Sequence, residues 1–208
     1  MTKTRPKIMI SSSVYGAQSL LRQVYATLLS YGEYDVICSP AGTIPVNPKG
    51  SNLESCLAAV EECDIYIGFI RPIYGSGRDY GMTTDSKKTS SKSVTHLELE
   101  KAIELDRARW MLTHSSVIKM RSLVRHIFYD KDGKRNATEF KELKGEFDDP
   151  RVIEMYELAA DSHSKKPWSQ RKNHWVHEYH YDFEALDFIS SQFRDPKRVA
   201  AYLNTPTP

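Results

Sequence analysis

Three glutamates in the segment "SVTHLELEKAIELD" (residues 93–106) have the type and spacing to suggest chemistry. They are Glu98, Glu100 and Glu104, in a stretch whose apolar residues recur at helical spacing. With successive residues 100° apart, the apolar side of the helix is formed by Leu99, Ala102, Ile103 and Leu105. Glu98 falls at the edge of that side, whereas Glu100 and Glu104 fall opposite, where water screens them.

Glu98 is therefore the candidate catalytic residue. We expect it near the start of a helix, where the helix dipole stabilises a carboxylate, and facing a sheet rather than solvent. A structural alternative is that Glu98 only binds first-turn amides or pairs with an arginine. A carboxylate at the rim of a ligand-binding crevice is the functional interpretation.

Alternating strand and helix patterns before residue 128 define the elements that would position Glu98. The predicted strands are Lys7–Ser11, Tyr34–Ser39, Asp64–Ile70 and Arg109–His114, and the predicted helices are Ala17–Ser30, Ser51–Cys63, Ser93–Asp106 and Ser115–Ile127. Such alternation predicts right-handed crossovers and a parallel sheet. We therefore expect an α/β fold, a flavodoxin-like three-layer sandwich.

In a flavodoxin-like sheet, ligands bind at the carboxyl ends of the first and third strands. The loops there are "SSSVYG" (residues 11–16) and "RPIYGSG" (residues 71–77), both rich in Gly, Ser and Tyr. The first precedes a helix and suits a phosphate or ribose, although serines that only cap the helix would explain it as well. The sequence contains neither GxGxxG nor GxxxxGK[ST], which argues against a dinucleotide fingerprint and a P-loop.

The remaining sequence, residues 129–208, predicts a charged excursion and a helical C-terminal extension that packs on the α/β domain of residues 1–128. Residues 130–149 are strongly charged, and a short helix follows to Ala160. We predict a last helix over Trp175–Phe193, with one apolar stripe. That stripe would either pack back on the first domain or join copies of the chain in a homo-oligomer.

The composition excludes several classes of protein. The chain of 208 residues has 29 basic and 27 acidic side chains, a balance that argues against nucleic-acid binding on charge alone. No apolar run approaches the roughly 20 residues of a membrane-spanning helix, and no signal peptide is apparent. The three cysteines lack CxxC spacing, so we expect reduced thiols in a cytoplasmic protein. His174, His177 and His180 more closely fit an aromatic, partly exposed face than a metal site.

Three stretches, "KIMISSSVYG", "SNLESCLAAVEECDIYIGFIRPIYGSG" and "SVTHLELEKAI", together resemble a bacterial domain-of-unknown-function family. The family often stands N-terminal to STAND NTPases, and it is related to TIR domains and nucleoside 2-deoxyribosyltransferases. The resemblance covers Lys7–Leu123. The tail "WVHEYHYDFEALDFISSQF" is similar to that of a narrower subgroup.

The resemblance implies a role for Glu98. The deoxyribosyltransferases carry a "GT..EL..A" helix whose glutamate attacks the anomeric carbon of the sugar, and in NAD-cleaving TIR domains a comparable glutamate engages the ribose next to nicotinamide. The matching positions here are Thr95, Glu98, Leu99 and Ala102. Two features depart from the family: Val94 replaces the glycine, and residues 14–18 lack the acidic residue common after the first strand.

We therefore expect a hydrolase of a nucleotide N-glycosidic bond, in the first place an NAD glycohydrolase in bacterial defence or signalling, with NAD as substrate and no cofactor. Glu98 would stabilise an oxocarbenium-like state or form a ribosyl intermediate. The expected substrate-binding residues are Ser11, Ser12, Tyr15, Tyr74, Gly75, Ser76 and Thr95, with Tyr74 stacking on a base. The alternative is a non-catalytic nucleotide-sensing or protein-interaction module. Such a module would act with a separately encoded partner or as a homo-oligomeric adaptor through Trp175–Phe193.

Overall fold

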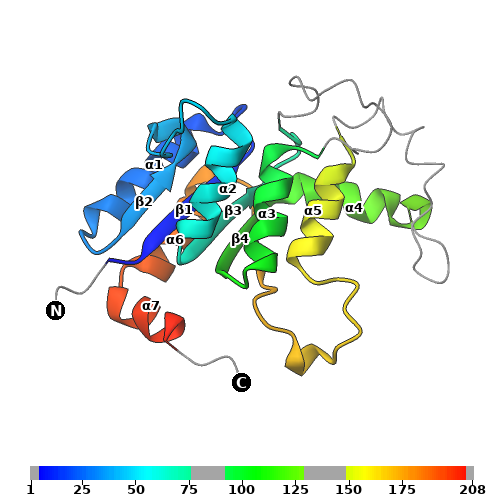
Figure 1. Cartoon of the computed structure of the whole chain (residues 1–208). Helices are drawn as coiled ribbons and strands as arrows, with labels where there is room; N and C mark the ends of the chain where they lie inside the picture. Colours follow the sequence, from blue (N-terminus) through cyan, green and yellow to red (C-terminus); the bar gives the residue numbers. More distant parts are fainter. Residues whose placement is uncertain (1–4, 76–91, 129–148, 205–208) are drawn as a thin grey trace.

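A five-stranded parallel sheet forms the centre of the protein (Figure 1). The computed structural model describes residues 5–75, 92–128 and 149–204, without the side chains of residues 125–128 and 168. The strands are β1 (Lys7–Ser12), β2 (Asp35–Cys38), β3 (Ile65–Ile70), β4 (Ala108–His114) and β5 (Val176–Tyr179). Their order is β2-β1-β3-β4-β5. This is the flavodoxin order, so the predicted fold class is confirmed.

Helices cover both faces of the sheet and complete the three layers. One face carries α1 (Gln18–Ser30), α6 (Asp182–Phe193) and α7 (Pro196–Leu203). The other carries α2 (Asn52–Glu62), α3 (Val94–Glu104), α4 (Ser115–Phe128) and α5 (Arg151–Ala159). Short 3-10 turns lie at Ser39–Ala41 and Trp168–Gln170. Among the described residues, no helix has both the length and the apolar character needed to cross a membrane.

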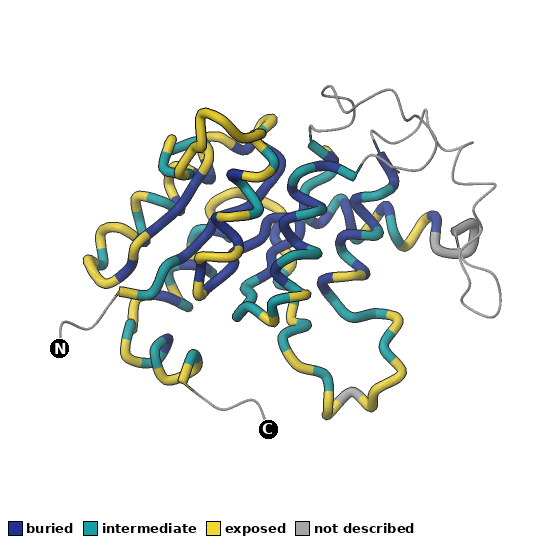
Figure 2. Tube along the Cα trace, in the orientation of Figure 1, coloured by how far each residue is buried: buried dark blue, intermediate teal, exposed yellow. Residues whose placement is uncertain are grey.

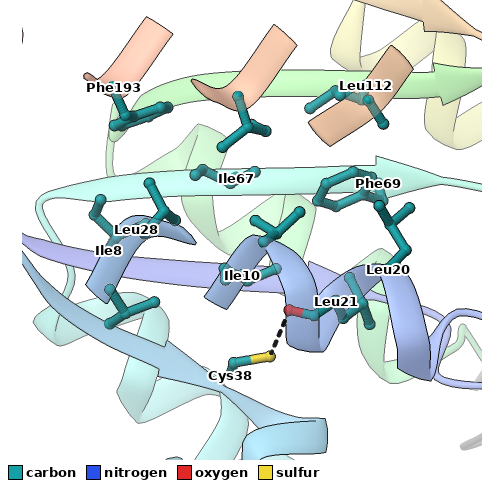
Figure 3. Packing of buried hydrophobic residues seen from close by; sticks show 14 of the residues in the cluster. Ile8, Ile10, Leu20, Leu21, Leu28, Cys38, Ile67, Phe69, Leu112 and Phe193 are labelled. Carbon is teal, nitrogen blue, oxygen red and sulfur yellow. Dashed lines mark hydrogen bonds between the residues drawn. The ribbon is translucent and has the colours of Figure 1, made fainter. Parts of the chain in front are cut away.

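Strand β3 lies at the middle of the sheet and is buried along its whole length (Figure 2). Successive side chains alternate between faces, so Ile67 and Phe69 enter the core under α1 and α6, as Figure 3 shows. Tyr66 and Ile70 enter the second core, under α2 and α3. The continuous apolar run that predicted this strand is therefore typical of a parallel sheet covered on both sides.

The N-termini of α2 and α3 are fixed by serine caps. The Ser51 hydroxyl accepts the Glu54 N–H at 3.1 Å, and the Glu54 carboxylate accepts the Ser51 N–H at 2.7 Å. The two residues therefore form a capping box. In α3, the Ser93 hydroxyl accepts the His96 N–H at 3.3 Å. These caps fix where the two helices begin, and with that the face that each turns to the sheet.

The single helix predicted over Trp175–Phe193 is wrong. Residues Val176–Tyr179 form β5, which pairs with β4 from Met111 to His114, and α6 begins only at Asp182. The Glu184 carboxylate fixes that start, because it accepts the N–H groups of His180 at 2.6 Å and Tyr181 at 3.0 Å. The apolar residues Val176, Tyr179 and Phe183 have the spacing expected for one face of a helix. Strand β5 has only four residues, which are too few to show the alternation of a strand.

Strand β5 and helix α6 join the same sandwich as the first 128 residues. Tyr179, Ile189 and Phe193 are buried in the core that α1 covers. A further helix, α7, was not predicted, and Asp195 caps it by accepting the N–H groups of Lys197 and Arg198. Most of the predicted loop 71–92 and nearly all of the charged segment 129–149 lie outside the described residues.

Candidate active site

Glu98 lies inside the protein and is held by three separate elements. Its side chain is 5% exposed and faces the sheet from α3. Ser11, near the carboxyl end of β1, donates a hydrogen bond from its Oγ to Glu98 Oε2 at 2.5 Å. The thiol of Cys56, on α2, is a second hydrogen-bond partner of the carboxyl group. The helical spacing therefore identified the glutamate that points inward.

The surroundings of Glu98 hold its pKa close to neutrality. Burial raises the pKa of Glu98 from 4.5 to about 7, and the hydrogen bonds from Ser11 and Cys56 oppose that rise. Burial, together with the charge of Glu98, raises the pKa of Cys56 to about 12, so the thiol stays protonated. A carboxyl group that titrates near pH 7 can exchange protons or act as a nucleophile under ordinary conditions.

Tyr66 extends this network beneath Glu98. Burial raises the pKa of Tyr66 far above its usual value, the charge of Glu98 adds to the effect, and a hydrogen bond with Ser11 opposes it. Ser11 is therefore a neighbour of both side chains, since its Oγ also donates to Glu98 Oε2. Tyr66, Ser11 and Glu98 form one buried polar cluster.

The other two glutamates of α3 face water, as their helical positions predicted. Glu100 pairs with Lys92, and its side chain is 36% exposed. Glu104 is 69% exposed and lies 3.6 Å from Lys101 Nζ. Neither carboxylate shares the environment of Glu98, so α3 offers a matched pair of buried and exposed glutamates for experiment.

The loops after β1 and β3 meet beside the start of α3. Gly75 has a φ of +92°, and a Cβ added there would lie 3.3 Å from Cβ of Ser13 and 3.8 Å from Cβ of Ser93. Ser12, 8% exposed, donates to the Ser13 carbonyl at 3.2 Å. The Ser13 hydroxyl is buried and has no hydrogen-bond partner among the described residues. Both predicted crevice loops therefore contribute to one place at the carboxyl edge of the sheet.

Tyr74 is buried rather than open to a base. Its hydroxyl lies 2.7 Å from His96 Nδ1, and the Arg151 guanidinium lies 4.3 Å above its ring centre. Burial lowers the pKa of His96 to about 4, so the imidazole is neutral at pH 7 and accepts the Tyr74 proton. A base could stack on the Arg151 side of Tyr74 only after displacing that arginine.

The other predicted binding residues have different positions. Thr95 is 8% exposed in the first turn of α3, and Tyr15 is 61% exposed. Ser76 lies outside the described residues. Cys56 and Tyr66, which both lie next to Glu98, were not predicted as site residues. Tyr66 could have been noticed in the sequence, because it is a polar residue within an otherwise apolar strand. Cys56 could not, since its role depends on how α2 and α3 pack.

The histidines near the C-terminus have structural partners. His177 stacks on Phe188 with ring centres 3.9 Å apart, and His180 Nδ1 lies 2.7 Å from the Ser115 hydroxyl. Within the described parts of the chain, no group of three metal-binding side chains comes together. These histidines therefore help to pack β5 and α6 against neighbouring elements.

A cavity of about 1250 Å³ lies at the opposite edge of the sheet from Glu98. It is lined by residues at the amino ends of the strands, among them Pro6, Asp64 and Ala108, and by α7 residues such as Ala200. Glu98 does not line this cavity. Chemistry at Glu98 therefore concerns the carboxyl edge, where ligands bind in open parallel sheets.

Comparison with known proteins gives six similar solved chains, two of which are named below, and one family. A CMP N-glycosidase, BcmB, from Clostridium botulinum matches 89% of this chain and 98% of its own, with 11% identity and a TM-score of 0.41. A conserved protein from Enterococcus faecalis V583 matches 91% of this chain and 99% of its own, with 10% identity and a TM-score of 0.41. No curated protein matches the sequence. Residues 7–205 match the family described as "Domain of unknown function (DUF4062)", and the chain belongs to that family.

Proposed function

We propose that the protein hydrolyses the N-glycosidic bond of a nucleotide, with NAD as the first candidate substrate and Glu98 as the catalytic carboxylate. The observation that carries this proposal is the buried Glu98, hydrogen-bonded to Ser11 at the carboxyl edge of the sheet, with a pKa raised to about 7. The spacing of Thr95, Glu98, Leu99 and Ala102, which resembles the deoxyribosyltransferase helix, supports it.

The reaction requires one carboxylate to act at the sugar. The bond between the anomeric carbon and the base nitrogen breaks, and its electron pair leaves with the nitrogen. Ionised Glu98 stabilises the resulting oxocarbenium-like carbon or forms an ester with it, and water then supplies the hydroxyl group and releases a proton. Nicotinamide leaves NAD as a neutral molecule without being protonated. A site with one buried carboxylate therefore suits NAD better than a base that needs a general acid.

Substrate can reach Glu98 only if the carboxyl edge opens. The carboxyl group is 5% exposed, and the loops at Ser13 and Gly75 meet close to the start of α3. Displacement of the Gly75 loop is the smallest change that would bring a ribose to Glu98. The proposed activity therefore includes an opening step before chemistry.

Release of nicotinamide from NAD tests this proposal directly. Wild-type protein should release nicotinamide, Glu98→Gln should release at least a hundredfold less, and Glu104→Gln should equal wild type. The last is the matched control, because Glu104 lies on the same helix in water. CMP and unphosphorylated nucleosides, assayed in parallel for base release, identify the preferred leaving group. Equal turnover in wild type and Glu98→Gln, or no release of any base by wild type, would refute the proposal.

A non-catalytic module that binds a nucleotide and passes the signal to another protein is the second candidate. Exposed aromatic side chains favour it: Tyr181 is 56% and Phe183 is 61% exposed, and their rings stack in parallel with centres 5.6 Å apart. A second copy of the chain is the partner that we propose for this surface. Light scattering should show a lower mass for Phe183→Asp than for wild type. Stabilisation by nucleotides without turnover would favour this candidate over the enzyme.

A further inference from the structure

Arg71 directly follows β3, and two nitrogens of its guanidinium group are buried without an acceptor among the described residues. Its Nε and Nη1 atoms are shielded from water and have no hydrogen-bond partner among the described residues. Arg71 continues the alternation of Ile67 and Phe69, so it belongs to the sheet face covered by α1 and α6. Burial of an arginine without an acceptor is unfavourable, which indicates that the group is placed for an external ligand.

Tyr179, at the end of β5, is a second buried donor without a partner. The side chain is 1% exposed, and its hydroxyl has no hydrogen-bond partner in the described part of the chain. Two edge-to-face contacts fix the ring, with Phe69 at 6.2 Å and with His114 at 5.4 Å between ring centres. The phenol is therefore held in place next to β3 and β4.

Arg71 and Tyr179 lie in one row across the sheet, because Ile70, next to Arg71, pairs with Thr113, and His114, next to Thr113, pairs with Tyr179. Burial raises the pKa of Tyr179 to about 12, and the positive charge of Arg71 opposes that rise. The same charge contributes to the lowered pKa of His114, after the larger effect of burial. Asp182 is the acidic group that acts on both Tyr179 and His114, and no ion pair joins it to Arg71 among the described residues.

His114 cannot serve as the missing acceptor. Its Nδ1 accepts the N–H of Ser116 at 3.2 Å, and its Nε2 lies 3.1 Å from the His180 carbonyl, to which it donates. Both nitrogens of the neutral ring are thus in use. Within the described parts of the chain, the cluster therefore combines a phenol proton and two guanidinium nitrogens that have no acceptor.

The N-terminus of α1 adds positive potential to the same region. Leu20, in the first turn, packs in the core with Phe69, and Figure 3 shows the two side by side. The cap residue, Ala17, supplies no side-chain hydrogen bond, and the first turn has no acidic residue. The first turn of this 13-residue helix therefore supplies no negative charge of its own to its amide end.

We propose that Arg71 and Tyr179 form a binding site for a phosphoryl group at the carboxyl ends of β3 and β5. A phosphoryl group carries negative charge and several acceptor oxygens, so it can take hydrogen bonds from the guanidinium and the phenol together. Its identity as the phosphate of a nucleotide rests on the proposed function. Ser11 pairs with Gly68, three residues before Arg71, so the two sites lie on the order of 10 Å apart along β3 and on opposite faces of the sheet. A nucleotide that reaches both sites must cross the carboxyl edge between them.

Binding of ribose 5-phosphate, measured by thermal shift and calorimetry, tests the site without any need for turnover. Ribose 5-phosphate and inorganic phosphate should stabilise wild type, whereas ribose and succinate should not. Arg71→Gln and Tyr179→Phe should each weaken ribose 5-phosphate binding by roughly tenfold or more, as expected for hydrogen bonds to a charged group. Arg22→Gln, which removes an exposed arginine of α1, should leave binding unchanged.

Tyr179→Phe separates binding from folding, because it removes a hydroxyl that has no partner among the described residues. The unliganded variant should unfold at a temperature no lower than that of wild type. Unchanged affinity in both site variants would overturn the proposal. It would also fail if wild type bound neither phosphate compound, or if succinate bound as tightly as ribose 5-phosphate.

The same variants distinguish this site from the proposed enzyme. Glu98→Gln should keep ribose 5-phosphate binding while it loses base release. Base release that depends on Glu98 but has the same KM in Arg71→Gln would overturn the phosphoryl site and leave the enzyme standing. Ribose 5-phosphate binding that depends on Arg71, without any base release by wild type, would overturn the enzyme and leave the phosphoryl site standing.

Discussion

Replacement of Glu98 by glutamine should stabilise the protein at alkaline pH and have little effect at acid pH. The folded protein holds the pKa of Glu98 at about 7 instead of 4.5, so folding favours the protonated carboxyl group. Below pH 4.5 the carboxyl group is protonated in both the folded and the unfolded state, so it does not lower the free energy of unfolding. As the pH rises, the unfolded state ionises first and the free energy of unfolding falls, and this loss is complete above pH 7.

The size of the effect follows from the shift in pKa. One pKa unit corresponds to about 1.4 kcal/mol, so a rise from 4.5 to about 7 corresponds to roughly 3 kcal/mol of lost stability above pH 7. Glutamine has almost the same shape and can still accept the Ser11 hydrogen bond, but it never becomes charged. The free energy of unfolding of Glu98→Gln should therefore exceed that of wild type by about 3 kcal/mol at pH 8.

Urea denaturation at intervals from pH 4.5 to pH 8 measures this difference. Glu104→Gln is the control, because it makes the same substitution on the same helix at a side chain that is 69% exposed. The quantity to compare is the difference between each variant and wild type, which cancels other titrating groups. A Glu98→Gln difference that stays constant with pH, or that shrinks as the pH rises, would refute the inference that this carboxyl group is buried at a cost.

Three further predictions concern the site and the core. Ser11→Ala removes a hydrogen bond to the Glu98 carboxylate and should raise the pKa that governs base release by about one unit, seen as a shift to higher pH in the profile of kcat/KM; a shift to lower pH would contradict this role. Phe193→Ala should lower the free energy of unfolding by about 3–5 kcal/mol in urea denaturation, because the ring is fully buried, whereas Phe183→Ala should have a small effect; equal losses would contradict the assigned core. Gly75→Ala should lower the melting temperature and cost about 1–3 kcal/mol, because φ is +92° and the new methyl group would meet Ser13; an unchanged melting temperature would show that the loop adopts another conformation.

The first four strands could be predicted because several local signals agreed for each. For β3, two local features both indicated a strand at this position: the apolar run of residues 65–70, and the helix before it, which is capped by Ser51. Strand β5 could not be predicted in this way. Only its pairing with β4, through contacts such as Met111 with Val176, makes it a strand, and pairing between distant segments leaves no local pattern.

The candidate site could likewise be predicted only where one helix or one strand end decides the position of a side chain. Glu98 was identified because one helix decides which of its side chains face inward, and Ser11 because parallel strands end at one edge of a sheet. Cys56 and Tyr66 enter the network through the packing of α2 and the pairing of β3, which a single sequence does not reveal. The burial of Tyr74 under Arg151 likewise depends on where α5 packs.

The position of β5 at the end of the sheet also affects how the chain is made. Its partner, β4, ends at His114, but β5 begins only at Val176. At ribosomal rates of about 5–20 residues per second, the β4 edge waits roughly 3–12 seconds for its partner. During that time its N–H and C=O groups, next to the apolar side chains of Met111 and Leu112, are open to other nascent chains. The exposed edge of β4 should therefore be a site of chaperone contact while the chain is being made.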